Sequence, residues 1–171
     1  MTEPTADLAA TSSRPREILS DPSQVGDRLA TLVDAAKHDI VLFGAELEAR
    51  LFSDAGLSGA LAHFAARHQH NRVRILVEDS AQVMHDNERL VTLVRRFSDS
   101  VDMREVGESH RGLREVFLVT DRSGYVHQED TTRALFIVDS RDRRSAALLA
   151  ERFDSMWAQS EPITGLRTVG I

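Results

Sequence analysis

One stretch of this chain, residues 113–139, constrains the fold more than any other. It contains three runs of β-type residues, bounded by polar and turn-forming residues. The expected strands are 115–120, 125–128 and 133–138. Asp121-Arg122-Ser123-Gly124 separates the first two strands and is typical of a tight turn, in which Gly124 is expected to take a positive φ. The stretch therefore predicts three consecutive strands that lead into a last helix.

Helical and strand patterns alternate along the rest of the chain. Asp21-Pro22 is typical of a helix start, with Asp21 as the cap, Pro22 in the first turn and Gln24 placed as a capping-box partner; this helix is expected to end near Lys37-His38. A last helix is expected to begin near Asp139-Ser140 and to carry a buried stripe that includes Phe153 and Trp157. The other expected elements are strands at 39–43, 72–78 and 101–106, a short helix or turn at 46–52, loops at 54–59, 79–86 and 107–112, a helix through Leu61, Phe64 and Ala65, and a helix capped by Asp86 or Asn87. This alternation predicts an α/β domain.

The length of 171 residues fits one domain with short tails. Residues 1–20 are expected to be a flexible or strap-like tail, because their first part is rich in Thr, Ser, Ala and Pro without periodicity. Residues 21–160 are expected to form the domain, and residues 161–171 a second tail that hangs free or adds a strand to something.

Composition excludes several classes of function. The net charge of −6 makes a nucleic-acid partner unlikely, because such binding needs a basic face. The chain has no cysteine, which removes thiol nucleophiles and disulfides. No stretch is apolar enough to cross a membrane and no signal peptide is evident, so a cytoplasmic location is expected. Lys37 is the sole lysine, a bias typical of a GC-rich bacterial genome.

The order of elements resembles that of the phospholipase D-like superfamily, from about Ser23 to Gln159. In that family a His-x-Lys-x4-Asp motif lies on a strand that leads into a turn, and a last helix carries an aromatic residue and a Trp. Asp121 falls on the Asp of the motif, but Arg114 falls on the His and Val116 on the Lys. The resemblance implies a single half of the family fold, a mixed β-sheet flanked by helices. Family enzymes use two such halves, so it also implies a homodimer.

The departures from the motif predict that the family chemistry is lost. A guanidinium stays protonated and offers no lone pair, so Arg114 cannot act as the nucleophile, and Val116 cannot hold a phosphate. The polar pair on the next strand falls near Gln128-Glu129, where a carboxylate repels phosphate, and Ala134 stands where the family often has an acid. Asp121 may be kept only as a turn residue. Arg114 is interpreted either as an anion-binding group or as a solvated residue paired with an acid.

The histidines do not predict a metal site. His63, His68 and His70 have no carboxylate at ligand spacing and are interpreted as a surface helix end, and no cofactor is expected. Alternation puts His127 beside Tyr125 on the second strand, and His110 lies in the loop before residue 113. The candidate pocket residues are Arg114, Val116, Asp121, Tyr125, His127, Glu129 and His110.

These observations predict a catalytically inactive binding or regulatory module that acts on a small anionic ligand or a protein partner. Degenerate domains of this resemblance accompany acetyltransferase domains in some bacterial proteins, and this chain is interpreted as such a module standing alone. Two alternatives stay open. One is a phosphodiesterase or other hydrolase with a rebuilt site that uses His127 or His110. The other is nucleic-acid binding through an arginine face.

Overall fold

The computed structural model describes residues 16–166 of the chain. The strands are β1 (Glu17–Leu19), β2 (Asp39–Gly44), β3 (Arg72–Val77), β4 (Val101–Glu105), β5 (Val116–Thr120), β6 (Gly124–Gln128), β7 (Phe136–Asp139) and β8 (Glu161–Pro162). The helices are α1 (Pro22–Ala35), α2 (Ala49–Phe52), α3 (Ala55–Arg67), α4 (Ser80–Asp86), α5 (Glu88–Arg96) and α6 (Arg143–Ala158), with a 3₁₀ turn at Glu108–His110.

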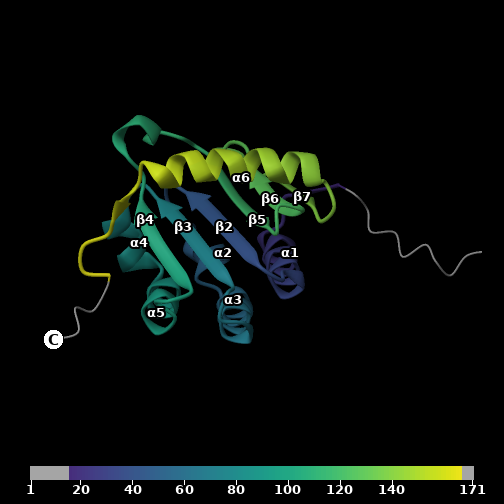
Figure 1. The fold of residues 1–171 in the computed structure, drawn as a ribbon. Coiled ribbons are helices and arrows are strands. Elements are labelled where there is room, and N and C mark those ends of the chain that lie inside the picture. Colours follow the sequence, from purple (N-terminus) through teal and green to yellow (C-terminus); the bar gives the residue numbers. More distant parts are fainter. Residues whose placement is uncertain (1–15, 167–171) are drawn as a thin grey trace, which may run out of the picture.

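These strands form one mixed sheet in the order β1-β7-β6-β5-β2-β3-β4-β8. The three strands β2, β3 and β4 are parallel, and all other neighbours are antiparallel. The helices α1, α3 and α5 lie on one face of the sheet, and α6 crosses the other face (Figure 1). The predicted α/β class with a mixed sheet flanked by helices is therefore confirmed.

Each face of the sheet buries its own apolar cluster, because successive strand residues point to opposite sides. In β2, Ile40 and Leu42 pack with the helices α1, α3 and α5, whereas Val41 and Phe43 pack with α6. The run Ile-Val-Leu-Phe is buried at all four positions, which explains why this strand has no alternation in its sequence. Phe153 of α6 is fully buried in the second cluster.

The first helix begins as predicted and ends earlier. Asp21 caps α1, because its side chain accepts a hydrogen bond from the Ser23 amide at 2.9 Å. The helix stops at Ala35 rather than near Lys37-His38, since the amides of residues 37–39 are held by a carboxylate from another part of the chain.

Two segments predicted as loops are helical. Residues 79–86 contain α4, which Asp79 caps by accepting from the Gln82 amide at 3.0 Å. Val83 is the buried residue of this helix, so the apolar periodicity that identifies a helix is missing from the sequence. Residues 54–59 contain the start of α3, where Asp54 accepts from the Gly56 amide at 2.8 Å.

The turn between β5 and β6 uses different residues for its positive φ than expected. Asp121 and Arg122 both have φ of 51°, whereas Gly124 is not among the residues with positive φ. The Ser123 amide donates to the Thr120 carbonyl at 3.0 Å and closes the turn. Gly124 serves close packing, because a Cβ there would lie 3.0 Å from Leu32 Cδ2 and 3.2 Å from Ser140 Cα.

The last helix starts later than predicted. Asp142, rather than Asp139 or Ser140, caps α6 through the Ser145 amide at 3.0 Å. Asp139 instead accepts from the amides of Arg141 and Asp142 and shapes the preceding turn. The third strand of the central stretch is also shorter than expected, 136–139 rather than 133–138.

Two short strands lie within the segments that were expected as tails. The strand β1 pairs with β7 at one edge of the sheet, and β8 pairs with β4 at the other edge. The rest of the two expected tails, residues 1–15 and 167–171, lies outside the described residues.

Candidate functional site

A cleft of about 800 Å³ lies at the carboxyl ends of the parallel strands β2, β3 and β4, where β5 begins. Ligands of open α/β sheets commonly bind at this edge. Its charged lining residues are Glu46, Glu78, Asp79, Glu105, Arg111 and Arg114. We call this cavity the cleft.

Three of its four carboxylates are engaged within the protein. Glu105 pairs with Arg111 at 3.0 Å and also accepts a hydrogen bond from the Ser80 hydroxyl. Glu78 accepts from the amide of Gly112 at 3.0 Å, and Gly112 takes the positive φ (86°) of this loop. Asp79 is the cap of α4. These bonds fix the walls of the cleft.

Arg114 and Glu46 are the charged lining residues that have no such partner. Neither side chain forms a hydrogen bond or an ion pair with any part of the chain that the structure describes. The main chain of Arg114 is fixed, because its carbonyl accepts from the Thr131 amide at 2.9 Å. The cleft therefore offers one positioned guanidinium and one carboxylate for contacts with a ligand.

The second motif position, Val116, is buried and does not line the cleft. Its side chain is 6% exposed and belongs to the cluster under α1, α3 and α5. A Cβ added at Gly44 of the neighbouring strand would lie 3.2 Å from Val116 Cγ2. The space beside the start of β5 is thus filled by apolar packing.

On the opposite face of the sheet, Glu115, His127 and Arg152 form a polar cluster beside α6. The Nε2 atom of His127 lies 2.7 Å from Glu115 Oε2, and Arg152 also pairs with Glu115. The imidazole packs edge-on against Phe117, with ring centroids 6.0 Å apart. Burial alone would raise the pKa of Glu115, but the hydrogen bonds from His127 and Arg152 hold it lower, at about 2.

The other predicted pocket residues are dispersed. Tyr125 is buried under α6, and this burial raises the pKa of its hydroxyl. Glu129 lines a separate hollow of about 370 Å³ with Arg114, Glu115 and Arg152. His110 ends the 3₁₀ turn and is not a lining residue of the cleft. Of the seven residues proposed from the sequence, the structure brings only Arg114 into the cleft.

Sequence reasoning missed the acids of the cleft, although a signal was present. Glu46 and Glu78 follow β2 and β3, and Glu105 ends β4. Because the carboxyl ends of parallel strands meet at one edge of a sheet, three such acids belong together. Among the described residues, no group of three or more His, Cys, Asp or Glu side chains could hold a metal ion.

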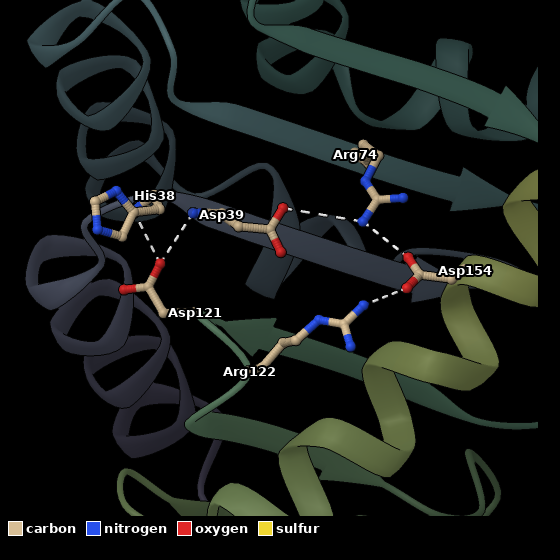
Figure 2. A network of polar contacts seen from close by, with 6 residues as sticks. All are labelled: His38, Asp39, Arg74, Asp121, Arg122 and Asp154. Carbon is tan, nitrogen blue, oxygen red and sulfur yellow. Dashed lines mark hydrogen bonds and ion pairs between the residues drawn. The ribbon is translucent and has the colours of Figure 1, made fainter.

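Asp121 lies at the far end of β5 from the cleft (Figure 2). Its carboxylate accepts from the amides of Lys37, His38 and Asp39 at 2.8, 2.9 and 2.9 Å. It thereby closes the connection between α1 and β2. The place of the motif acid is filled here by a residue with a structural task.

The same end of the sheet holds an ion-pair network that ties down α6. Asp154 of α6 lies between Arg74 of β3, at 3.0 Å, and Arg122 of the β5–β6 turn (Figure 2). Arg74 is also 3.9 Å from Asp39 and stacks over the Phe153 ring at 5.2 Å. Burial raises the pKa of the Asp39 carboxyl, and the nearby Arg74 offsets part of that effect.

A family model described as "Domain of unknown function (DUF7931)" matches residues 21–169. No curated protein matches the sequence. Within the described residues, no helix combines the length and the apolar character that a membrane crossing needs.

Solved structures resemble this chain at low sequence identity. TrmBL2, an archaeal chromatin protein with a novel mode of DNA binding, has a TM-score of 0.63 at 14% identity, over 91% of this chain and 57% of its own. NucT from Helicobacter pylori has a TM-score of 0.64 at 8% identity, over 86% of this chain and 98% of its own. Nuc, a phospholipase D family member from Salmonella typhimurium, has a TM-score of 0.58 at 11% identity, with the same coverages. The chain therefore has a phospholipase D-like fold, and it spans little more than half the length of TrmBL2.

Proposed function

The chain belongs to the family described as Domain of unknown function (DUF7931), and we propose that it is a phospholipase D-like domain that works by binding rather than by catalysis. The observation that carries this proposal is the start of β5. Arg114 stands in the cleft at the position of the motif His, and Val116 is packed in the core at the position of the motif Lys. No histidine is among the lining residues of the cleft. A phosphoryl group would find neither a nucleophile nor a lysine there.

The charges of the cleft support a small ligand with one anionic group. Arg114 is free to form a two-point contact with a carboxylate or a similar anion. Four carboxylates line the same space, so a ligand with several negative charges would be repelled. Glu46, which has no partner in the described chain, suits an amino or amide group on the same ligand. The charge pattern thus favours a ligand that carries both an anionic group and a hydrogen-bond donor.

We further propose that the protein is a cytoplasmic homodimer. Family enzymes bring two halves together around their site, and this chain supplies one half whose cleft lies at the sheet edge. A second copy placed against this edge would close the cleft from outside. Buried contacts of this kind strengthen a charge-assisted hydrogen bond, because they remove water from it.

The test is native mass spectrometry of the freshly purified protein, followed by a denaturing run. We expect a dimer that carries extra small-molecule mass, and the Arg114→Ala variant should lose that mass. Arg143→Ala is the matched control, because this exposed arginine of α6 lies outside the cleft. A bare monomer in both proteins would contradict the proposal, and a bare dimer would move the weight to a protein partner.

A phosphodiesterase assay separates binding from catalysis. With bis(p-nitrophenyl) phosphate as the probe, we expect no turnover above that of the buffer. The rebuilt-histidine alternative is favoured by one contact, the 2.7 Å pair between His127 and Glu115. Turnover that disappears in both His127→Gln and His110→Gln variants would establish that alternative and overturn the binding proposal.

Nucleic-acid binding is a second candidate function, favoured by the likeness to a DNA-binding chromatin protein. Its net charge of −6 and the acids of the cleft weigh against it. The sequence analysis treated nucleic acid as an unlikely partner, and this neighbour returns it to the tests. A mobility shift with double-stranded and single-stranded DNA, weakened by added salt, would support it.

A further inference from the structure

Among the described residues, three large hydrophobic side chains are exposed: Ile18 at 65%, Leu135 at 49% and Leu148 at 56%. They come from β1, from the segment before β7 and from α6, which are far apart in the sequence. Single exposed hydrophobic residues are common and need no explanation, whereas a group at one place marks an interaction site.

The strand register brings these side chains to one place. Ile18 is paired with Ile137 of β7, and Ile137 is paired with His127 of β6. Ile137 packs on the α6 side of the sheet, so alternation puts Ile18 and Leu135 on that side too. We call Ile18, Leu135, Ile137 and Leu148 the β1 corner.

Leu148 forms the wall of the β1 corner. It precedes Arg152 by one helical turn, so the two side chains leave α6 on the same side. Arg152 reaches Glu115, which pairs with His127 in the row that continues to Ile137 and Ile18. The helix thus meets the sheet at an apolar step beside the edge strand.

The edge of β1 can accept another strand. In the described part of the chain, β1 pairs with β7 on one side and with no strand on the other. A free strand edge presents unpaired N–H and C=O groups that bind an extended peptide, and nearby pockets then select its side chains.

Arginines surround the β1 corner. The exposed residues Arg16, Arg133 and Arg144 precede β1, Leu135 and Leu148 in sequence, and none of them forms an ion pair in the described part of the chain. The nearby acids are Glu151, which is exposed, and Asp142, whose carboxylate is the cap of α6. The rim is therefore positive overall.

We propose that the β1 corner is the docking site for an extended segment of a partner protein in which apolar residues alternate with Asp or Glu. The backbone of the segment pairs with β1, its apolar side chains cover the corner, and its acids contact the arginines of the rim. A second copy of this chain fits less well, because a symmetric pairing brings the arginines of two rims together.

The test uses two synthetic peptides and the isotope-labelled full-length protein. One peptide is acetyl-Glu-Val-Asp-Leu-Glu-Val-Asp-Leu-amide, and the other has Lys in place of each acid. We expect saturable amide shifts along β1 and β7 with the acidic peptide alone, weakened by salt. The Leu148→Glu variant should lower the affinity at least about tenfold. Ser155→Glu is the control, because it adds the same charge at an exposed site two turns further along α6.

Four results would overturn the proposal. Absence of binding by either peptide is the first, and equal binding of the acidic and basic peptides is the second. Concentration-dependent shifts at the β1 corner without peptide, abolished by Leu148→Glu, would assign the surface to a second copy of the chain. Sedimentation with phosphatidylserine vesicles, lost in Leu148→Glu and unmatched by peptide binding, would assign it to a membrane surface.

Discussion

The two ends of β5 differ in what their side chains do. At its start, Arg114 reaches the cleft without a partner in the described chain, and Val116 packs among apolar residues. At its end, Asp121 accepts three main-chain hydrogen bonds, and Arg122 pairs with Asp154 of α6. The acid of the motif therefore has a structural reason to be present that is separate from catalysis. In this fold the frame and the chemistry can be replaced independently.

The largest effect is expected at the structural end. Asp121→Ala removes both carboxylate oxygens and places alanine at a φ of 51°, which L-residues other than Asn and Asp rarely adopt. We expect the free energy of unfolding to fall by about 3 kcal/mol, measured by urea denaturation.

Two variants separate the causes of that loss. Asp121→Asn keeps one acceptor and tolerates the positive φ, so it should recover more than half of the lost stability. Asp121→Gly relieves the backbone but restores no acceptor, so it should stay close to the alanine variant. An alanine variant as stable as the original protein would show that the two ends of β5 do not differ in this way.

An intermediate effect is expected from Glu115, next to the cleft end of β5. Its pKa in the folded protein is about 2, below the value of 4.5 for an unperturbed side chain. A depressed pKa means that the contacts with His127 and Arg152 add stability above pH 4.5, and that this stability is lost as the pH falls toward 2.

The Glu115→Gln variant should remove that pH dependence. We expect the difference in unfolding free energy between variant and original protein to be on the order of 1 kcal/mol near neutral pH, because solvent screens these partly exposed groups. The difference should shrink in acid, as measured by urea denaturation across the acidic range. A difference that stays constant with pH would show that the ion pairs do not hold the carboxylate ionised.

The smallest effect on stability is expected at Arg114. Its side chain has no hydrogen bond or ion pair in the described residues, so Arg114→Ala should change the unfolding free energy by less than about 0.5 kcal/mol. This variant is therefore suited to the ligand experiment, because it should fold normally. A thermal unfolding curve checks it, and a large loss would mean that Arg114 belongs to the frame rather than to the cleft.

Local patterns predicted the elements whose signals are strong. The apolar run at 39–43 gave a buried strand, and Asp21-Pro22 marked the start of α1. The order of elements also indicated the phospholipase D-like fold, which the structural likenesses confirm. These features depend on neighbours in the sequence, so a single sequence contains them.

The misses depend on partners that are distant in the sequence. The end of α1 is fixed by Asp121, more than 80 residues away, and the acids of the cleft meet only when three strands align. The helix α4 has one buried residue, Val83, which leaves no periodic pattern to detect. Positive φ fell on Asp121 and Arg122 rather than on the glycine, because Gly124 was needed for contact with Leu32 and Ser140.

The two borders of the sheet are unequal, and this limits how copies of the protein can join. The strand β8 has two residues, and one of them is Pro162, which has no N–H to donate. The β1 border is the one able to recruit a further strand. A molecule with a single receptive border can join one more strand and then stops, so strand addition to the folded protein cannot propagate into a filament.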